Sequence, residues 1–198
     1  MRLLRILAAV HGQVWNASRL GQGLALDYTT VNSYMNYITE TFLARMLELY
    51  QVNIRKRLVK SPKLYWRDTG LLHALLNINK PDQDILPVQP WLGASREGFV
   101  IEQLLDELFV RGQRYTPYWF RSSDGYELDL VLEMAGEKWP FEIKLTAAPG
   151  VQGMQRLDKA AELIGASRRF LVSQAGDAAG DQHRAACNIQ WLLYEVIG

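Results

Sequence analysis

The sequence has little of what several protein classes need. It contains one cysteine, Cys187, which excludes an internal disulfide framework and favours a reducing compartment, so a cytoplasmic location is expected. The three histidines, His11, His73 and His183, stand at no spacing typical of metal ligands. No apolar run approaches the length that crosses a bilayer, and a membrane partner is therefore not expected.

The opening segment MRLLRILAAVHG mixes charge and apolar residues as a signal peptide does, but Arg5 interrupts the apolar run and no convincing small-residue cleavage site follows. We interpret it as a helix. With 198 residues, of which 48% are hydrophobic, the chain is long enough for one large domain or two small ones.

Charge is divided unevenly along the chain. Residues 1–80 carry 11 Lys+Arg against 4 Asp+Glu, a net charge of +7, whereas residues 81–198 carry 11 Lys+Arg against 17 Asp+Glu, a net charge of −6. This division indicates two modules, and the basic one is expected to face a polyanion or an acidic partner. A chance distribution of charge is the alternative.

The pattern of the first module is typical of a winged helix-turn-helix. Asn16 can cap a short second helix through Leu20, the GQG at 21–23 then makes a turn, and Asp27 can cap a third helix. Apolar residues recur at helical spacing in the first and third helices, at Leu3, Leu7 and Val10 and at Val31, Met35, Ile38 and Phe42. Two alternating segments, 46–52 and 63–67, follow as a hairpin with a basic loop.

A winged helix can place its third helix in a major groove while the wing neutralises phosphates. We therefore expect DNA contacts from Thr29, Thr30, Asn32, Ser33, Asn36, Arg55, Lys56, Arg57, Lys60 and Lys63. The helix face has no arginine, so bidentate reading of guanine is not available and base specificity is expected to be weak. The alternative is that this module docks onto a protein and that its basic loop is merely solvated.

Three prolines, Pro81, Pro87 and Pro90, follow a helix over 68–78 that Asp68 can cap, and they indicate a linker. We predict a winged helix-turn-helix over 1–80, a linker over 81–94 and a second domain over 95–198.

The second domain opens with a helix from Ser95, whose apolar stripe also carries Glu97. A carboxylate in a first turn can simply complement the helix dipole, and this is the alternative to a functional role. Strands are expected over 114–121, 127–133 and 140–145, the last starting at Pro140. A helix with Met154, Leu157, Ala161 and Ile164 follows, and then strands over 168–173 and 188–197.

Two of these strands form an expected hairpin whose turn is centred on Ala135-Gly136, so the numbers of paired residues add up to 271. In strict alternation, Leu128 points to one face and Asp129 and Val131 to the other. Asp129 and Glu142 satisfy the register and would lie opposite each other with Cβ atoms about 4.5–5.5 Å apart. Carboxylates at this distance repel unless a cation lies between them, and Mg²⁺ or Mn²⁺ is the expected cofactor.

Lys144 lies on the same face as Glu142 and could orient a water molecule or stabilise negative charge on a phosphate. Asp129 and Glu142 would hold the metal ion, and Glu97 could complete its shell. A slip of one residue in the hairpin would destroy this geometry. Arg156, Lys159, Arg168 and Arg169 could contact phosphates, although a solvated charged face is the alternative.

The segments GASREGFVIEQLL, WFRSSDGYELDLVLE and FEIK resemble the nuclease-like domain of the PD-(D/E)xK superfamily found at the C-terminus of many prokaryotic AAA-type ATPases. LVKSPKLYWRDTGLL resembles the segment before that domain. The resemblance implies an α/β (α+β) fold, with a winged helix followed by a restriction-endonuclease-like αβββαβ core and a mixed sheet. It also implies that Glu97, Asp129, Glu142 and Lys144 occupy the superfamily's catalytic positions.

The chain has no G-x-x-x-x-G-K-[ST] motif and no Gly-Lys pair, so ATP hydrolysis is not expected from it. Its start at LLRIL favours a fragment of a longer protein, and the resemblance implies an upstream ATPase domain or partner. Two functions are expected: a metal-dependent DNA nuclease, or a catalytically silent regulatory module that binds nucleic acid or protein for that ATPase. A component of a toxin–antitoxin or defence system is a third hypothesis.

Overall fold

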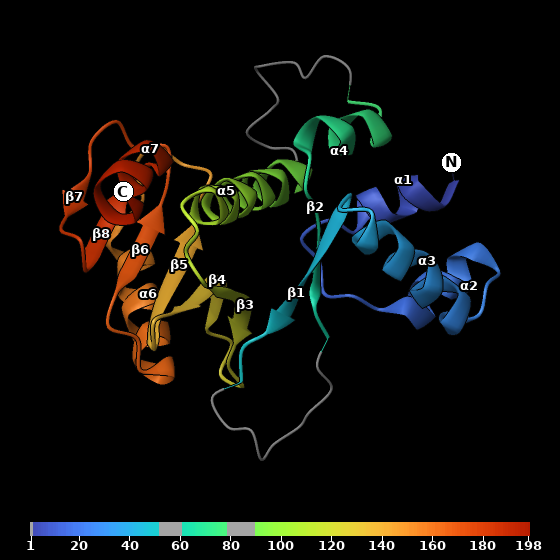
Figure 1. Cartoon of the computed structure of the whole chain (residues 1–198), viewed down its shortest axis with the longest axis horizontal. Coiled ribbons are helices and arrows are strands. Elements are labelled where there is room, and N and C mark those ends of the chain that lie inside the picture. Colours follow the sequence, from blue (N-terminus) through green and yellow to red (C-terminus); the bar gives the residue numbers. More distant parts are fainter. Residues whose placement is uncertain (1, 52–60, 79–89) are drawn as a thin grey trace. The chain divides into compact units, whose positions relative to one another are not determined.

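The computed structural model describes residues 2–51, 61–78 and 90–198, which belong to two compact units (Figure 1). Unit 1 comprises Met1–Leu47 and Val59–Phe99, and unit 2 comprises Glu48–Leu58 and Val100–Gly198. Both units combine helices and strands, so the expected mixed α/β class is confirmed. No helix in the described ranges is long and apolar enough to cross a membrane.

Unit 1 is mainly helical. Its elements are α1 (Arg2–Ala9), α2 (Ala17–Leu24), α3 (Tyr28–Glu40), the first part of β1 (Ala44–Leu49), β2 (Lys63–Trp66), α4 (Thr69–Leu75) and the start of α5 (Pro90–Val110). β1 pairs antiparallel with β2, from Ala44 opposite Trp66 to Leu47 opposite Lys63. The hairpin expected after the third helix is therefore present, although its strands are shorter than predicted.

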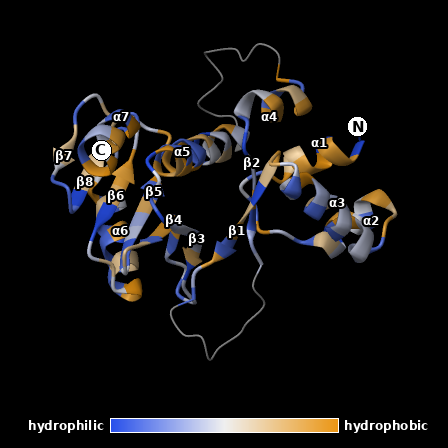
Figure 2. Ribbon diagram, viewed as in Figure 1, coloured by the Kyte–Doolittle hydropathy of each residue, from blue (hydrophilic) through white to orange (hydrophobic). Residues whose placement is uncertain are grey.

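The core of unit 1 forms where the apolar faces of its helices meet. Val31, Met35 and Ile38 of α3 are buried together with Leu7 of α1, as their spacing predicted. The apolar character of α1 is visible along its ribbon in Figure 2. Phe42 was expected on the same face, but it lies beyond the end of α3 in a left-handed conformation (φ 60°) and is 73% exposed. That part of the prediction is wrong because the helix ends before reaching it.

The predicted helix caps are confirmed. The side chains of Asn16, Asp27 and Asp68 accept hydrogen bonds from main-chain N–H groups three residues further on. The turn predicted at 21–23 is wrong, because these residues lie inside α2. Gly21 serves a close approach instead, since a Cβ atom there would lie 2.5 Å from the carbonyl oxygen of Leu26.

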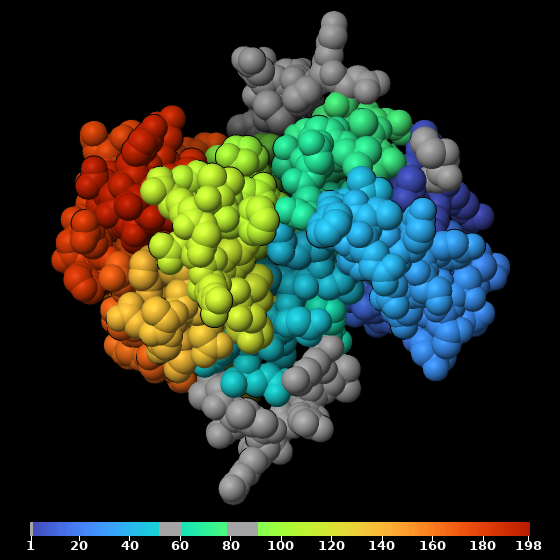
Figure 3. Space-filling view, in the orientation of Figure 1, coloured from blue at the N-terminus to red at the C-terminus, as the bar shows by residue number. Residues whose placement is uncertain are grey.

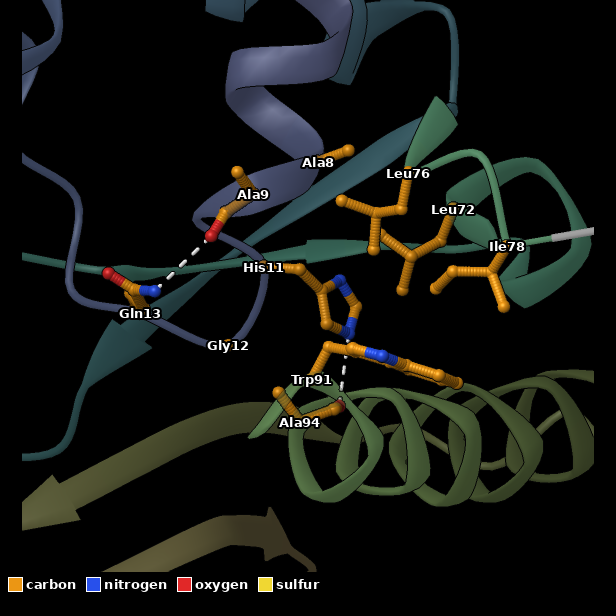
Figure 4. Close-up of a pocket in the computed structure, with 10 residues that line it drawn as sticks. All are labelled: Ala8, Ala9, His11, Gly12, Gln13, Leu72, Leu76, Ile78, Trp91 and Ala94. Atoms are coloured by element: carbon orange, nitrogen blue, oxygen red, sulfur yellow. Dashed lines mark hydrogen bonds between the residues drawn. The ribbon is translucent and has the colours of Figure 1, made fainter. Parts of the chain in front are cut away.

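His11 joins three elements of unit 1. Its Nδ1 accepts a hydrogen bond from the N–H of Trp66 at 3.0 Å, and its Nε2 lies 3.0 Å from the carbonyl oxygen of Ala94. The Nε2 atom is therefore the donor, as in a neutral imidazole. A Cβ atom at Gly98 would lie 2.6 Å from Nε2, so α5 comes this close only with glycine there. The ring borders an apolar pocket of about 550 Å³ (Figure 4).

Unit 2 is built on a mixed sheet. Its strands run in the order β1 (its end only), β3 (Thr116–Arg121), β4 (Glu127–Met134), β5 (Glu137–Ile143), β6 (Arg169–Val172), β8 (Arg184–Cys187) and β7 (Ala179–Gly180). β3, β4 and β5 are antiparallel neighbours, whereas β6 lies parallel to β5 and β8. Helix α6 (Val151–Ile164) packs on β4, β5 and β6. The order α5–β3–β4–β5–α6–β6 is the expected αβββαβ order. In Figure 3 the part of the chain coloured lime, which follows the start of α5 in the sequence, covers a continuous area of the face in view.

Three predictions of secondary structure need correction: the start of a helix, the start of a strand and, in the next paragraph, the conformation of residues 188–197. Helix α5 begins at Pro90, inside the predicted linker, because proline is compatible with the first position of a helix. β5 begins at Glu137, so Pro140 is an interior residue of the strand. The N–H of Lys144 donates to Val172 of β6, and by the alternation along a strand position 140 faces β6 as well. Because β6 pairs with β5 only from Phe141 onward, the missing N–H of Pro140 costs no ladder hydrogen bond.

The segment 188–197 is helical and not a strand. The Asn188 side chain accepts a hydrogen bond from the N–H of Trp191 and so caps a helical turn, α7 (Ile189–Trp191), which continues as the π-helix η2 (Leu192–Ile197). Leu192 and Ile197 are the buried residues of η2. The strand that completes this part of the sheet is β8, which precedes the segment.

The β4–β5 hairpin has the predicted register. Leu130 lies opposite Phe141 and Met134 opposite Glu137, and both pairs of numbers add up to 271. The turn residues Ala135 (φ 49°) and Gly136 (φ 82°) both have positive φ, as two-residue hairpin turns require. Alanine carries a steric cost in this conformation that glycine does not.

Ala135→Gly is therefore expected to raise the free energy of unfolding by about 1 kcal/mol, because it removes the strain of a Cβ atom at positive φ. Chemical denaturation measures the change. The control is Ala147→Gly, at an exposed position outside the left-handed region, which is expected to lower stability by about 0.5 kcal/mol. Equal losses in both variants would show that the turn is not strained.

Candidate active site

β4 contains a β-bulge at the end of the hairpin where the acidic residues lie. Tyr118 lies opposite Val131 and Phe120 opposite Leu128, so two steps along β3 match three along β4. The extra residue turns Leu128 and Val131 to the same face, where both join the cluster that packs with α6. The predicted strict alternation is therefore wrong here, and Asp129 lies within the bulge.

Asp129 is held by the neighbouring strand. The ladder of paired residues between β4 and β5 ends at Leu130 and Phe141, and the Asp129 Oδ2 atom then accepts a hydrogen bond from the N–H of Ile143 at 2.7 Å. A carboxylate bonded to a main-chain N–H of the next strand has a defined position. The bulge and this bond together bring Asp129 to the end of β5 where Glu142 and Lys144 lie.

Glu142 is the most enclosed member of this group, with a side chain that is 17% exposed. Its Oε1 atom accepts a hydrogen bond from the Lys144 ammonium group, whose side chain is 44% exposed. Its Oε2 atom is buried and has no hydrogen-bond partner among the described residues. A buried carboxylate oxygen without a partner is costly, and such an atom calls for an explanation.

The surroundings raise the pKa of Glu142 from 4.5 to about 7. Burial is the largest cause, because it disfavours the charged carboxylate, and the negative charge of Asp129 is the second. Lys144 acts in the opposite direction, and Glu127 adds a smaller repulsion. Asp129 is thus close enough to repel Glu142, whereas the predicted placement of the two carboxylates directly opposite each other stays a prediction. Glu127 belongs to the same surroundings although it was not predicted as a site residue.

Glu97 has a different environment, in unit 1. Its Oε1 atom lies 3.3 Å from the Nζ atom of Lys63 and accepts a hydrogen bond from the hydroxyl group of Tyr65. The side chains of Lys63 and Glu97 are 7% and 17% exposed. Asp129, Glu142 and Lys144 belong to unit 2, so the role of Glu97 in the same metal shell stays a prediction.

The predicted DNA-binding residues fall into four groups, the last of which is described in the next paragraph. Lys63 is buried and paired with Glu97, which argues against the predicted phosphate contact, since a phosphate-binding lysine must reach the surface. Ser33 and Asn36 are exposed on α3, as predicted. The remaining wing residues, Arg55, Lys56, Arg57 and Lys60, lie outside the described residues.

The other polar side chains of α3 serve its own structure. The hydroxyl groups of Thr29 and Thr30 donate to the carboxylate of Asp27, and these bonds hold the pKa of that carboxyl at about 2. Asn32 accepts a hydrogen bond from the indole of Trp15 at 3.0 Å. Reading of bases by these three residues would require breaking bonds that the helix already uses.

Sequence reasoning missed the aromatic side chains on the outer side of α3. Tyr34 and Tyr37 are exposed, and so is Phe42 beyond the end of the helix. Their signal was present in the spacing, since positions 34 and 37 fall outside the apolar face of Val31, Met35 and Ile38. Exposed aromatic side chains are frequent in binding surfaces.

The chemistry of the acidic group fits a hard divalent cation. Asp129 and Glu142 offer carboxylate oxygens, and the buried Oε2 atom of Glu142 has an unused acceptor. Within the described ranges, no three His, Cys, Asp or Glu side chains form a group that could hold a metal ion. Mg²⁺ often takes one or two protein carboxylates and completes its shell with water and substrate phosphates, so two carboxylates fit this mode.

Two family models match the chain. One is described as "Domain of unknown function (DUF8612)" and matches residues 1–82, and the other is described as "Domain of unknown function (DUF4143)" and matches residues 92–192. The second match includes α5 from its third residue onward and the hairpin with Asp129 and Glu142. Neither description states an activity.

Two mycobacterial proteins are similar to the chain, "Uncharacterized protein Mb2031c" of Mycobacterium bovis and "Uncharacterized protein Rv2008c" of Mycobacterium tuberculosis. Each is 41% identical over 155 residues, which are 78% of this chain and 34% of the relative. The chain thus spans about a third of the length of these relatives. No solved structure matches it.

Glu97→Ala is expected to lower the free energy of unfolding by about 3 kcal/mol, because it removes the carboxylate that faces a buried lysine. Urea denaturation measures the loss. Glu107→Ala, which breaks an exposed ion pair with Arg111 on the same helix, is the control and should cost about 0.5 kcal/mol or less. The double variant Lys63→Met with Glu97→Met should recover much of the loss, since both charges leave together. An equal loss of stability in Glu97→Ala and Glu107→Ala would contradict a structural role of Glu97.

The raised pKa of Glu142 predicts a pH-dependent stability. Between about pH 4.5 and pH 7 the folded chain holds a proton at Glu142 that the unfolded chain releases, so this group lowers the free energy of unfolding as pH rises through that window. The full effect is about 3 kcal/mol. Glu142→Gln should therefore equal the unaltered chain in stability near pH 4.5 and exceed it progressively up to pH 8, in denaturation with a chelator present.

Glu133→Gln provides the control for this measurement, because Glu133 is an exposed residue of the neighbouring strand β4. Its difference from the unaltered chain should stay within about 0.5 kcal/mol at every pH. A Glu142→Gln variant that is less stable than the unaltered chain at pH 8 would mean that the ion pair with Lys144 outweighs the cost of burial.

Proposed function

Because the chain belongs to the family described as "Domain of unknown function (DUF4143)", whose description gives no activity, we propose from its own residues that it is a metal-dependent DNA nuclease. One observation carries the proposal: the Oε2 atom of Glu142 is buried without a partner among the described residues, beside the like charge of Asp129 and the ammonium group of Lys144. Carboxyl groups with a shifted pKa gather at functional sites.

The fold assignment belongs to the same proposal. The order α1–α2–α3–β1–β2 suits a winged helix, and the order α5–β3–β4–β5–α6–β6 suits the PD-(D/E)xK core that the sequence resembles. In such a core the acids stand on adjacent strands and the lysine two residues after the second acid, as Asp129, Glu142 and Lys144 do.

Each of these residues has a distinct role in the proposed reaction. Asp129, fixed by the Ile143 N–H, and Glu142 would hold Mg²⁺ or Mn²⁺, which supplies phosphate polarisation and a more acidic bound water. Glu142 has to lose its proton for this, and its pKa of about 7 allows the loss near neutral pH. Lys144 is sufficiently exposed to reach a substrate and would orient the attacking water or stabilise negative charge on the phosphate.

An upstream ATPase domain or partner completes the proposal. It rests on the resemblance to C-terminal domains of AAA-type ATPases and on the greater length of the mycobacterial relatives. In this setting the nuclease site would act on DNA presented by the ATPase.

A catalytically silent regulatory module that binds nucleic acid or protein is the second candidate. The exposed Tyr34, Tyr37 and Phe42 favour it, because they provide contact area without chemistry. The two candidates make different demands on Asp129 and Lys144, and substitution of these residues separates them.

Purified protein incubated with plasmid and linear DNA in Mg²⁺ or Mn²⁺ is expected to cleave both. Asp129→Asn and Lys144→Ala should each lower the rate about 100-fold or more, because each removes a group that acts on the reacting phosphate. Glu133→Gln changes a carboxylate on the same strand away from the site and should keep the rate within about twofold. Gel electrophoresis of the products measures the rates.

The outcomes separate the candidates. Cleavage that survives both Asp129→Asn and Lys144→Ala points to a contaminating nuclease and removes the enzyme proposal. Salt-dependent binding of DNA without cleavage supports the silent module.

A further inference from the structure

Unit 2 contains a polar cleft that the proposed reaction does not use. It has a volume of about 370 Å³ and lies between the β3–β4 turn and α6. Tyr126 and Asp124 line it from the turn, and Gln152, Gln155, Arg156 and Lys159 line it from α6. The four helix residues recur at intervals of three, one and three, so they share one side of α6.

The cleft lies at the end of the sheet that carries the acidic pair. Lys138, near the start of β5, donates a hydrogen bond at 2.7 Å to the carbonyl oxygen of Ile164 at the end of α6. Helix α6 therefore runs antiparallel to β5, and its first turns lie near Glu142. Tyr126 directly precedes Glu127, whose charge acts on Glu142.

The cleft and Glu142 also share a face of the sheet. Leu171 of β6 pairs with Glu142 and belongs to the cluster that packs with α6. A Cβ atom at Gly153 would lie 3.3 Å from the Leu171 Cδ1 atom, so the first turn of α6 lies directly over this leucine. Paired residues of neighbouring strands project to the same face, and Glu142 therefore lies on the side that α6 covers.

The chemistry of the cleft suits a chain of phosphates. Arg156 and Lys159 are exposed, and neither has an ion-pair partner within the part of the chain that the structure describes. Gln152 and Gln155 add amide donors beside them. Asp124 contributes one negative charge at the turn, where its carboxylate accepts a weak hydrogen bond from Ser123. Two cations and two amides face this single acid, so the cleft favours an anion.

We propose that this cleft binds backbone phosphates of the DNA strand that enters the acidic site, with Arg156 and Lys159 as the phosphate-binding residues. This inference rests on the proposed function, because it assigns the path of that substrate. The contacts are to the backbone and carry no base sequence.

The test is binding of a short fluorescent DNA duplex, measured by anisotropy in a chelator over a series of NaCl concentrations. The double variant Arg156→Gln with Lys159→Gln is expected to weaken binding about 10-fold and to reduce the slope of log K against log[NaCl] by about 1 to 2. The matched control is Arg111→Gln with Arg114→Gln, which removes the same charge from exposed positions of unit 2 outside the cleft. It should weaken binding less than about threefold.

Several results would overturn the proposal. Equal losses in the two double variants mean that overall charge and not the cleft binds DNA, and an unchanged affinity of the cleft variant excludes the cleft. The proposal is also wrong if the unaltered chain binds no DNA. It is wrong as well if the chain binds anionic lipid vesicles in preference to DNA through the same two residues. Thermal unfolding of each variant shows whether the fold is retained.

The experiment also separates this proposal from the nuclease proposal, because binding is measured without metal. Asp129→Asn should abolish cleavage and retain binding. Loss of binding in the cleft variant of a chain that never cleaves DNA supports the cleft and removes the enzyme. Unchanged binding and cleavage in that variant support the enzyme and remove the cleft.

Discussion

The register of the β4–β5 hairpin is the constraint on which the candidate site depends. Side chains of a strand alternate between two faces, so a slip of one residue would carry Glu142 and Lys144 away from the face that α6 covers. The turn at Ala135-Gly136 sets the register, and the hydrogen bond from the Ile143 N–H to Asp129 secures its far end. The site thus sits between two local features that both act on the pairing of the same two strands.

Burial of the Glu142 carboxyl opposes the stability of this arrangement. The group lies under α6 near a second carboxylate, and the compensation from Lys144 is incomplete because that lysine is partly in water. A chain selected for stability alone would have an apolar residue or a glutamine at this position. The proposed metal site would account for this cost, because a bound cation would compensate the buried carboxylate.

The parts of the fold that were predictable from the sequence are those set by near neighbours. The caps by Asn16, Asp27 and Asp68 depend on main-chain groups three residues away, and the hairpin register depends on one two-residue turn. The bulge at Asp129 was not predictable, because it arises in the pairing of β3 with β4 and lies beyond Leu130, where the ladder of β4 with β5 ends. The sequence therefore predicted the register of the hairpin, but not that Leu128 and Val131 share a face.

Two of the errors arose where glycines or β-forming residues pointed to the wrong local structure. Glycines at 21–23 suggested a turn, but Gly21 is needed for the close approach of Leu26. The apolar and aromatic residues at 188–197 suggested a strand, but Asn188 starts a helical turn and β8 already fills the neighbouring place in the sheet. Intrinsic preferences are weak in such segments, and packing decides between helix and strand.

Two Glu–Lys pairs in the chain show how similar residues acquire different roles. In the pair of Glu97 and Lys63 the lysine is buried, and Tyr65 also donates to the carboxylate. Both charged groups are therefore bonded to other residues of the fold. In the pair of Glu142 and Lys144 the lysine is 44% exposed, and one carboxylate oxygen is buried without a partner in the described part of the chain. The first pair resembles a structural ion pair, whose removal leaves a buried charge. The second combines a buried acceptor without a partner among the described residues and a partly exposed cation. For this reason Glu142, rather than Glu97, is the glutamate around which the proposed chemistry is built.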